Sequence, residues 1–260
     1  MKNLIILEEQ VDEARGYLQK LEQILSNLNQ ETKDTHYPKP DSKYCVFVDA
    51  GHGAINPNTQ KYECIVGGKQ FTHKGTRQFH NQTDTYFEGV GNRILAEKLI
   101  QKLKENGISY VKTYHEYLDY GLVQRASIAN VHHRTKQKGF GESIHSNASQ
   151  NHKATGWCVF TSPRQTESDR LADELYLRTR DSIEESYKVK MKSDKWSDGD
   201  WDWEAKFTIL TRTAMPFVLS ENMFFDYLKD ALLLMDSTFQ DKLIQPKLEA
   251  VIWGQENLVI

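Results

Sequence analysis

Short apolar runs alternate with longer amphipathic stretches over most of the chain. Residues 44–50 (YCVFVDA) and 156–162 (GWCVFTS) have the length and apolar character of buried strands. Residues 88–107 and 168–187 instead carry apolar side chains at the three- and four-residue spacing of helices. Strands that alternate with helices of this length are typical of βαβ units. The pattern therefore predicts an α/β domain whose sheet is at least partly parallel.

The N-terminal segment follows a different pattern. Its apolar residues are spaced alternately by three and four, as in a heptad repeat, at Leu4, Leu7, Val11, Ala14, Leu18, Leu21, Leu25 and Leu28. We expect a helix over residues 1–30, which either forms a homo-oligomeric coiled coil through residues 4–28 or lies on its own domain. Residues 31–43 lose this period and contain two prolines, so they read as a linker to a domain at 44–260.

Composition and charge exclude several classes of protein. The formal net charge of the 260 residues is −3, which argues against nucleic-acid binding by bulk electrostatics. No apolar run approaches the roughly 20 residues needed to span a membrane. The three cysteines are scattered and odd in number, so free thiols are expected. The N-terminus MKNLIILEEQ lacks a secretory apolar region, which predicts synthesis in the cytoplasm without an export signal.

Ionisable residues stand at the ends of three predicted strands. His52 follows residues 44–50, His145 ends a short strand candidate, and Glu221 directly follows the run 215–220. Glu88 begins the first long helix of the domain. Ligands of open α/β sheets bind beyond the carboxyl ends of the strands, so these side chains are expected in one crevice. Two histidines and a carboxylate form a standard zinc ligand set, and a second carboxylate can act as general base. Spacing alone leaves hydrogen-bonded core histidines as the alternative.

Five ordered motifs carry a family resemblance. They are VDAGHG (48–53), Glu88 with the helix that follows it, LVQRASIAN (122–130), SIHSNAS (143–149) and MPFVLSENMFF (215–225). On these motifs the chain resembles the zinc-dependent N-acetylmuramoyl-L-alanine amidases, a family that includes bacterial cell-separation amidases and phage endolysins. The resemblance covers roughly residues 44–254.

This resemblance implies a fold, a reaction and a set of site residues. The fold is a twisted, mixed, mostly parallel sheet flanked by helices. The reaction is hydrolysis of the amide bond between N-acetylmuramic acid and L-alanine in peptidoglycan. One Zn²⁺ ion is held by His52, Glu88 and His145, Glu221 is the catalytic glutamate, and no organic cofactor is needed. Arg125 and Asn130 also match the family pattern, but both fit equally a role in tying a helix to the sheet.

Weaker expectations concern residues near these motifs. Asn147 is expected either to orient His145 or to line a substrate groove. Aromatic side chains in an Asp- and Ser-rich segment either stack on the substrate or pack the flank of the domain, namely Trp196, Trp201 and Trp203. They precede two apolar runs, 207–210 and 215–220, which are expected to be the last strands of the sheet. The final stretch, 226–254, is expected to be a helix that Pro246 kinks or breaks.

The sequence departs from the family pattern in two places, and each departure leaves a structural alternative open. The segment 54–87 is long for a connection and contains His73 and His80, either of which could replace a metal ligand. Gly141 and Glu142 stand just before the SIH motif, at positions that are usually apolar in the family. The strand that leads into this motif is therefore not clearly expected to be buried.

Alternative functions remain open from the sequence. One is a zinc peptidase or carboxypeptidase acting within the stem peptide, and another is a non-catalytic coiled-coil protein that binds peptidoglycan. Because no signal peptide is apparent, an enzyme acting on the cell wall would need another route, which is compatible with a phage lytic enzyme.

Overall fold

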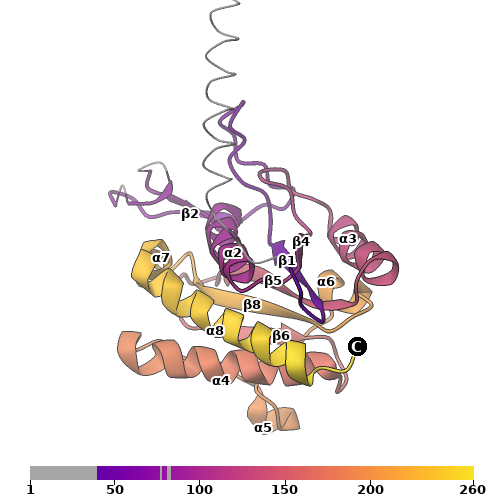
Figure 1. Cartoon of the computed structure of the whole chain (residues 1–260). Coiled ribbons are helices and arrows are strands. Elements are labelled where there is room, and N and C mark those ends of the chain that lie inside the picture. The colour runs from indigo at the N-terminus through magenta and orange to yellow at the C-terminus, as the bar shows by residue number, and fades with distance from the viewer. Residues whose placement is uncertain (1–39, 77, 81–82) are drawn as a thin grey trace, which may run out of the picture. The chain divides into compact units, whose positions relative to one another are not determined.

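The computed structural model describes residues 40–76, 78–80 and 83–260 (Figure 1). They belong to the compact unit Lys39–Ile260. The helix predicted for residues 1–30, and with it the coiled-coil contact through 4–28, lies outside the described residues. In the part of the chain that is described, no helix is both long and apolar enough to cross a membrane.

A six-stranded sheet forms the centre of the domain. Its strands, in spatial order, are β4 (Tyr110–Lys112), β1 (Cys45–Ala50), β5 (Gly139–Asn147), β8 (Phe217–Phe224), β6 (Cys158–Thr161) and β7 (Trp203–Glu204). The first four strands pair in parallel, β6 runs antiparallel to β8, and β7 is parallel to β6. The expected mixed, mostly parallel sheet is therefore confirmed.

Helices cover both faces of this sheet (Figure 1). One face carries α2 (Glu88–Glu105), α4 (Glu167–Tyr187), α7 (Leu228–Met235) and α8 (Ser237–Asn257), and the other carries α3 (Leu122–Thr135) and α6 (Thr208–Arg212). Strand β1 shows why both faces must be covered. Val46 and Val48 belong to the core under α2 and α8, whereas Cys45 and Phe47 belong to the core under α3. Alternate residues of a strand point to opposite faces, so a continuously apolar run is buried on both sides.

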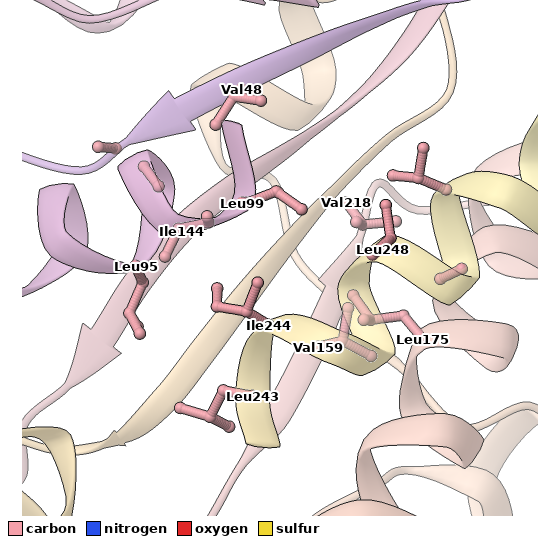
Figure 2. Packing of buried hydrophobic residues seen from close by; sticks show 14 of the residues in the cluster. Val48, Leu95, Leu99, Ile144, Val159, Leu175, Val218, Leu243, Ile244 and Leu248 are labelled. Carbon is pink, nitrogen blue, oxygen red and sulfur yellow. The ribbon is translucent and has the colours of Figure 1, made fainter. Parts of the chain in front are cut away.

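The larger core lies between the sheet and the helices α2, α4 and α8. Figure 2 shows Leu99 of α2 and Leu248 of α8 on the same side of the sheet as Val218 of β8. Each of these side chains is at most 5% exposed. This packing fixes α2 against the sheet and thereby the position of its first residue, Glu88.

The C-terminal helical stretch differs from the prediction. It breaks at Asp236, whose side chain caps α8 by accepting a hydrogen bond from the Phe239 backbone N–H at 2.8 Å. Pro246 lies inside α8 without ending it. A proline leaves the carbonyl four residues earlier without its helical donor. Here that carbonyl, of Lys242, accepts a hydrogen bond from Ser182 Oγ at 2.8 Å, so α8 continues through the proline.

The apolar run 207–210 was also predicted wrongly as a strand. It enters the short helix α6, where Ile209 and Leu210 are buried against the core that α3 covers. A four-residue apolar run has no clear period, so its length cannot distinguish a strand from a helical turn. The run 215–220 does form a strand, as part of the longer β8.

The strand β5 is buried despite its two unexpected residues. The Phe217 ring lies so close to Gly141 that a Cβ there would be 2.3 Å from a ring carbon. The Glu142 carboxylate accepts hydrogen bonds from Lys247 Nζ and from Ser220 Oγ. A glycine and a paired carboxylate thus replace the usual apolar packing.

The long segment 54–87 has some structure of its own. It contains a two-stranded antiparallel sheet, β2 (Gln70–Thr72) with β3 (Thr85–Phe87), and a bridge between Ile55 and Tyr62. The Tyr62 hydroxyl accepts a hydrogen bond from the Gly89 backbone N–H at 3.0 Å, which joins the segment to the start of α2.

Candidate functional site

The carboxyl ends of three neighbouring strands bring the predicted site residues together. His52 follows β1, while His145 and Glu221 are paired in register on β5 and β8. Glu88 is the first residue of α2. The predicted helix start at Glu88 and the position of His52 just after a strand agree with the structure. The strands of His145 and Glu221 continue beyond these residues, to Asn147 and Phe224, so the predicted strand ends were too early.

The Glu88 carboxylate lies between the two histidines. Its Oε1 atom is 3.3 Å from His52 Nε2 and 3.2 Å from His145 Nδ1. One ligand atom from each of the three residues lies within 4.8 Å of the others. The Glu88 side chain is fully buried, whereas the histidine side chains are 12% and 15% exposed. The group therefore sits at the base of an accessible depression.

Electrostatics favour the charged form of this carboxylate. Burial alone would raise the pKa of Glu88, but the close contacts and charge of His145 and His52 outweigh burial and lower that pKa below its ordinary value. Lys69 Nζ lies 3.3 Å from Glu88 Oε2, at ion-pair distance. Glu88 is thus ready to act as an anionic ligand.

The three side chains fit a metal ion. Among the described residues, His52 Nε2 and Glu88 Oε2 are buried and make no hydrogen bond of good geometry. Their polar neighbours, Glu88 Oε1 and Lys69 Nζ respectively, are each 3.3 Å away. Buried polar atoms are almost always hydrogen-bonded, so such orphan atoms at one point indicate a missing ligand. Two imidazoles and a carboxylate are a donor set that zinc accepts, with a further position left for water.

Glu221 is a second carboxylate beside this group. Burial and the nearby charge of Glu88 raise the pKa of Glu221 well above its ordinary value, although Lys69 acts in the opposite direction. Its Oε2 atom is buried and has no hydrogen-bond partner in the part of the chain that the structure describes. A carboxyl group in this state is suited to accept and return a proton.

A cleft of about 550 Å³ opens over these residues. His52, His145, Glu221 and Lys69 line it. Its apolar lining includes side chains that are between 41% and 72% exposed, namely Ile65, Val66, Leu122 and Phe207. The site therefore combines polar groups with exposed apolar surface.

Arg125 holds the backbone that carries His52. Its guanidinium donates to the Ala50 carbonyl at 2.6 Å and to the His52 carbonyl at 2.9 Å. It also pairs with Asp49 at 2.8 Å and with Asp119 at 3.0 Å. Because His52 has a left-handed φ of 63°, which non-glycine residues rarely adopt, these bonds help to keep it there. These contacts are of the tying kind that the sequence left open, and Arg125 also lines the cleft.

Two asparagines that the sequence did not point to contact the candidate metal ligands. Asn92, one turn after Glu88 on α2, places Nδ2 3.4 Å from Glu88 Oε1 and donates to the Gly51 carbonyl at 3.2 Å. Asn222 donates to the His145 carbonyl at 2.9 Å. Asn92 falls on the buried face of an amphipathic helix. A polar residue on that face is the feature of the sequence that could have indicated its role.

Glycine at position 51 makes room for His145. A Cβ at Gly51 would lie 2.1 Å from His145 Cε1, so any side chain there would displace the imidazole. The glycine of the DAGHG motif is therefore a packing requirement of the site.

Several predicted residues lie away from the cleft. Asn147 and the three tryptophans 196, 201 and 203 are not among its lining residues. The Asn147 side chain accepts a hydrogen bond from the Ala148 backbone N–H. Trp196 is fully exposed, and Trp201 stacks on Tyr176 with ring centroids 5.0 Å apart. Asn130 bonds the backbone of Arg212 and of Ala214, which joins α3 to the segment before β8.

The extra histidines of segment 54–87 are also elsewhere. His73 Nε2 bonds the Phe225 carbonyl at 2.9 Å, and the His80 ring packs on Tyr86 with centroids 4.9 Å apart. The residue of this segment that reaches His52 is Cys64, which forms a second possible ligand group with His52 and Asp119.

Residues 46–252 match the family model for N-acetylmuramoyl-L-alanine amidase. A comparison with curated protein sequences gave no significant match. Two similar solved structures are the N-acetylmuramoyl-L-alanine amidase from Clostridium difficile 630 and the amidase Ami1 from Mycobacterium smegmatis.

These structures share the fold of the described domain. The Clostridium difficile enzyme is 23% identical with a TM-score of 0.63, and the match covers 84% of this chain and 100% of that one. The Mycobacterium smegmatis enzyme is 16% identical with a TM-score of 0.62, and the match covers 85% of this chain and 100% of that one. With the family model spanning most of its length, the chain belongs to the N-acetylmuramoyl-L-alanine amidase family, hydrolases that cleave the amide bond between N-acetylmuramic acid and L-alanine in peptidoglycan.

Proposed function

We propose that the chain cleaves this amide bond with one Zn²⁺ ion held by His52, Glu88 and His145, and with Glu221 as general base. The proposal rests on one observation, the grouping of two histidines and a buried carboxylate within 4.8 Å at the floor of a cleft. Other divalent ions compete for such a site, so the preference for zinc comes from the ligand types and the family.

The metal supplies the activation that an amide requires. Zinc, when bound, lowers the pKa of water toward ~7 and stabilises negative charge that develops on a carbonyl oxygen. Glu88 contributes the negative charge of the ligand set, and Asn92 holds its Oε1 atom in place. Arg125 fixes the loop of His52 through the backbone.

Glu221 moves the protons of the reaction. Its unpartnered Oε2 atom accepts a proton from the attacking water and then gives a proton to the departing nitrogen of L-alanine. The apolar side chains along the cleft, such as Val66 and Phe207, exclude water from the surroundings of the reacting amide.

The cell wall is the proposed place of action.

The heptads at residues 4–28 support a homo-oligomer, in which several catalytic domains would act on one polymer. Sedimentation of the full chain and of a version without residues 1–30 tests the oligomer, which should be lost with that segment. A monomeric full chain would contradict it.

Digestion of purified peptidoglycan tests the chemistry. The wild-type chain should release stem peptides that begin with L-alanine, as identified by mass spectrometry. Glu221→Gln should lower this rate by about 100-fold or more, since general acid–base catalysis contributes roughly 10²–10⁴-fold. The exposed Glu256→Gln is the matched control and should keep the wild-type rate.

Metal removal provides the second half of this test. A chelator should abolish release, and added zinc should restore it. Fragments cut within the stem peptide would point to a peptidase instead. A metal-bound protein that yields no fragments would favour the peptidoglycan-binding alternative.

A further inference from the structure

Three buried aspartates form a cluster outside the cleft. Asp169 lies in the first turn of α4, and Asp200 and Asp202 lie between α5 (Lys195–Asp198) and β7. Their residues are 3%, 8% and 0% exposed, and one oxygen from each lies within 4.8 Å of the others. None of the three lines the cleft. Like charges at this distance need compensation when they are buried.

Hydrogen bonds satisfy this cluster incompletely. Asp202 Oδ2 accepts from Thr161 Oγ1 at 2.5 Å, and Asp169 Oδ1 lies 3.3 Å from the same hydroxyl. A hydroxyl has one proton, so Thr161 can donate to only one of these carboxylates at a time. Asp202 Oδ1 is buried and has no hydrogen-bond partner among the described residues. The most deeply buried carboxylate of the cluster therefore keeps one oxygen without a hydrogen bond.

Protein cations do not neutralise the centre of the cluster. Within the described ranges, no ion pair reaches Asp169 or Asp202. Lys195 is close, but its Nζ atom sits 3.7 Å from the centre of the Trp201 ring, and its charge acts on Asp173. The charge on Asp202 must be removed either by a bound cation or by a proton.

We propose that Asp169, Asp200 and Asp202 bind one structural calcium ion. Every ligand in the cluster is oxygen, as hard cations require, and neither histidine nor cysteine belongs to it. Calcium–oxygen distances of about 2.3–2.6 Å allow two ligands of one ion to be up to about 5 Å apart. The observed limit of 4.8 Å falls within that range. Water and the Thr161 hydroxyl can complete the coordination.

The ion would join three separate parts of the fold. Thr161 ends β6, Asp169 begins α4, and the pair Asp200 and Asp202 leads into the edge strand β7. This edge of the sheet consists of the shortest strand, with two residues, and has little packing of its own. Calcium would therefore stabilise the sheet edge and the start of α4 without taking part in amide hydrolysis.

Terbium luminescence tests binding directly. Tb³⁺ binds to calcium sites, and Trp201 stands between two of the proposed ligands, so excitation of tryptophan should produce terbium emission. The full chain is first loaded with zinc, which keeps terbium from the histidine site. Calcium should displace the terbium. Asp202→Asn should weaken binding by more than about 100-fold, because changes even beyond the direct ligands of a metal lower affinity roughly 10- to 100-fold. Asp241→Asn, at a 68% exposed side chain, is the matched control.

Thermal unfolding tests the structural role. Calcium at about 100 times its dissociation constant should raise the Tm of the wild-type chain by roughly 5–10 °C. The gain should vanish in Asp202→Asn and in the second variant, Asp200→Asn, and should persist in Glu88→Gln, which alters only the zinc group. An unchanged wild-type Tm with calcium, or terbium emission that Asp202→Asn retains, would overturn the proposal. In that case a proton shared between the acids neutralises the cluster.

Discussion

Single residues in this protein position the proposed metal ligands through their neighbours. Glu88 lies on α2 one turn before Asn92, and the Asn92 amide contacts both the carboxylate and the Gly51 carbonyl. Ser146 Oγ donates to Asn92 Oδ1 at 3.2 Å, which fixes the orientation of the amide. The donor end of Asn92 therefore faces the ligand, and its acceptor end faces β5.

Replacing Asn92 should weaken metal binding without unfolding the protein. Asn92→Ala removes the group that orients Glu88, so zinc affinity should fall by about 10- to 100-fold, the usual range for such partners. Competition with a chromophoric chelator measures this affinity. Gln101→Ala, on the exposed side of the same helix, should leave it unchanged. Equal affinities for Asn92→Ala and wild type would show that Glu88 needs no such support.

The four central residues could be predicted from the sequence because strand ends and motif order restrict them. His52, Glu88, His145 and Glu221 stand at positions that any α/β sheet brings to one edge. Asn92 could not be predicted in the same way, because its role depends on a contact with Gly51 that forms only when α2 packs on β1. The position of Cys64 near His52 could not be predicted either, because the sequence of segment 54–87 has no helix or strand period that would indicate its path.

At the scale of elements, α8 depends on a hydrogen bond from another helix. Its internal Pro246 leaves the Lys242 carbonyl without a helical donor, and Ser182 on α4 supplies one. The sequence pattern predicted the helix but also a kink or a break at the proline. The replacement donor comes from 60 residues away along the chain, which no local pattern can reveal.

Removing this donor should destabilise the contact between α4 and α8. Ser182→Ala should lower the free energy of unfolding by about 0.5–1.5 kcal/mol, the usual contribution of one hydrogen bond. Urea unfolding measures the change. Ser186→Ala, an exposed serine on α4, should leave the stability within about 0.5 kcal/mol of wild type. A similar loss for both variants would mean that the bond to Lys242 does not account for the effect, because helix propensity alone favours alanine over serine.

At the scale of the whole molecule, the alternation of strands and helices predicts the layered architecture but not every strand. β6 is antiparallel to β8, which the periodicity of residues 156–162 could not indicate, since a buried strand reads the same in either direction. The short apolar run 207–210 was ambiguous for a related reason, because four residues are too few to show a period. Pairing direction is decided by tertiary contacts, which a local pattern does not contain.

The stability of the whole domain should depend on pH through His80. Burial lowers the pKa of His80 from 6.5 to about 4, although a hydrogen bond with the Phe87 backbone opposes the shift. Between these two values the unfolded chain holds a proton that the folded chain does not, so stability falls as the pH decreases. The contribution is complete above pH 6.5 and is lost progressively as the pH falls toward 4. Between pH 7 and 5 the loss from this residue should be about 1–2 kcal/mol.

Comparison of wild type with His80→Gln isolates this contribution. Glutamine has a similar size and does not titrate, so the decrease in unfolding free energy between pH 7 and 5 should be smaller in the variant by that amount. Urea unfolding at both pH values measures the difference, with unfolding at pH 7 showing first that the variant is folded. An equal decrease in unfolding free energy for both proteins would mean that His80 takes up its proton while the rest of the domain stays folded. The segment around β2 and β3 would then open locally below pH 6.5 while the sheet and its metal group remain intact.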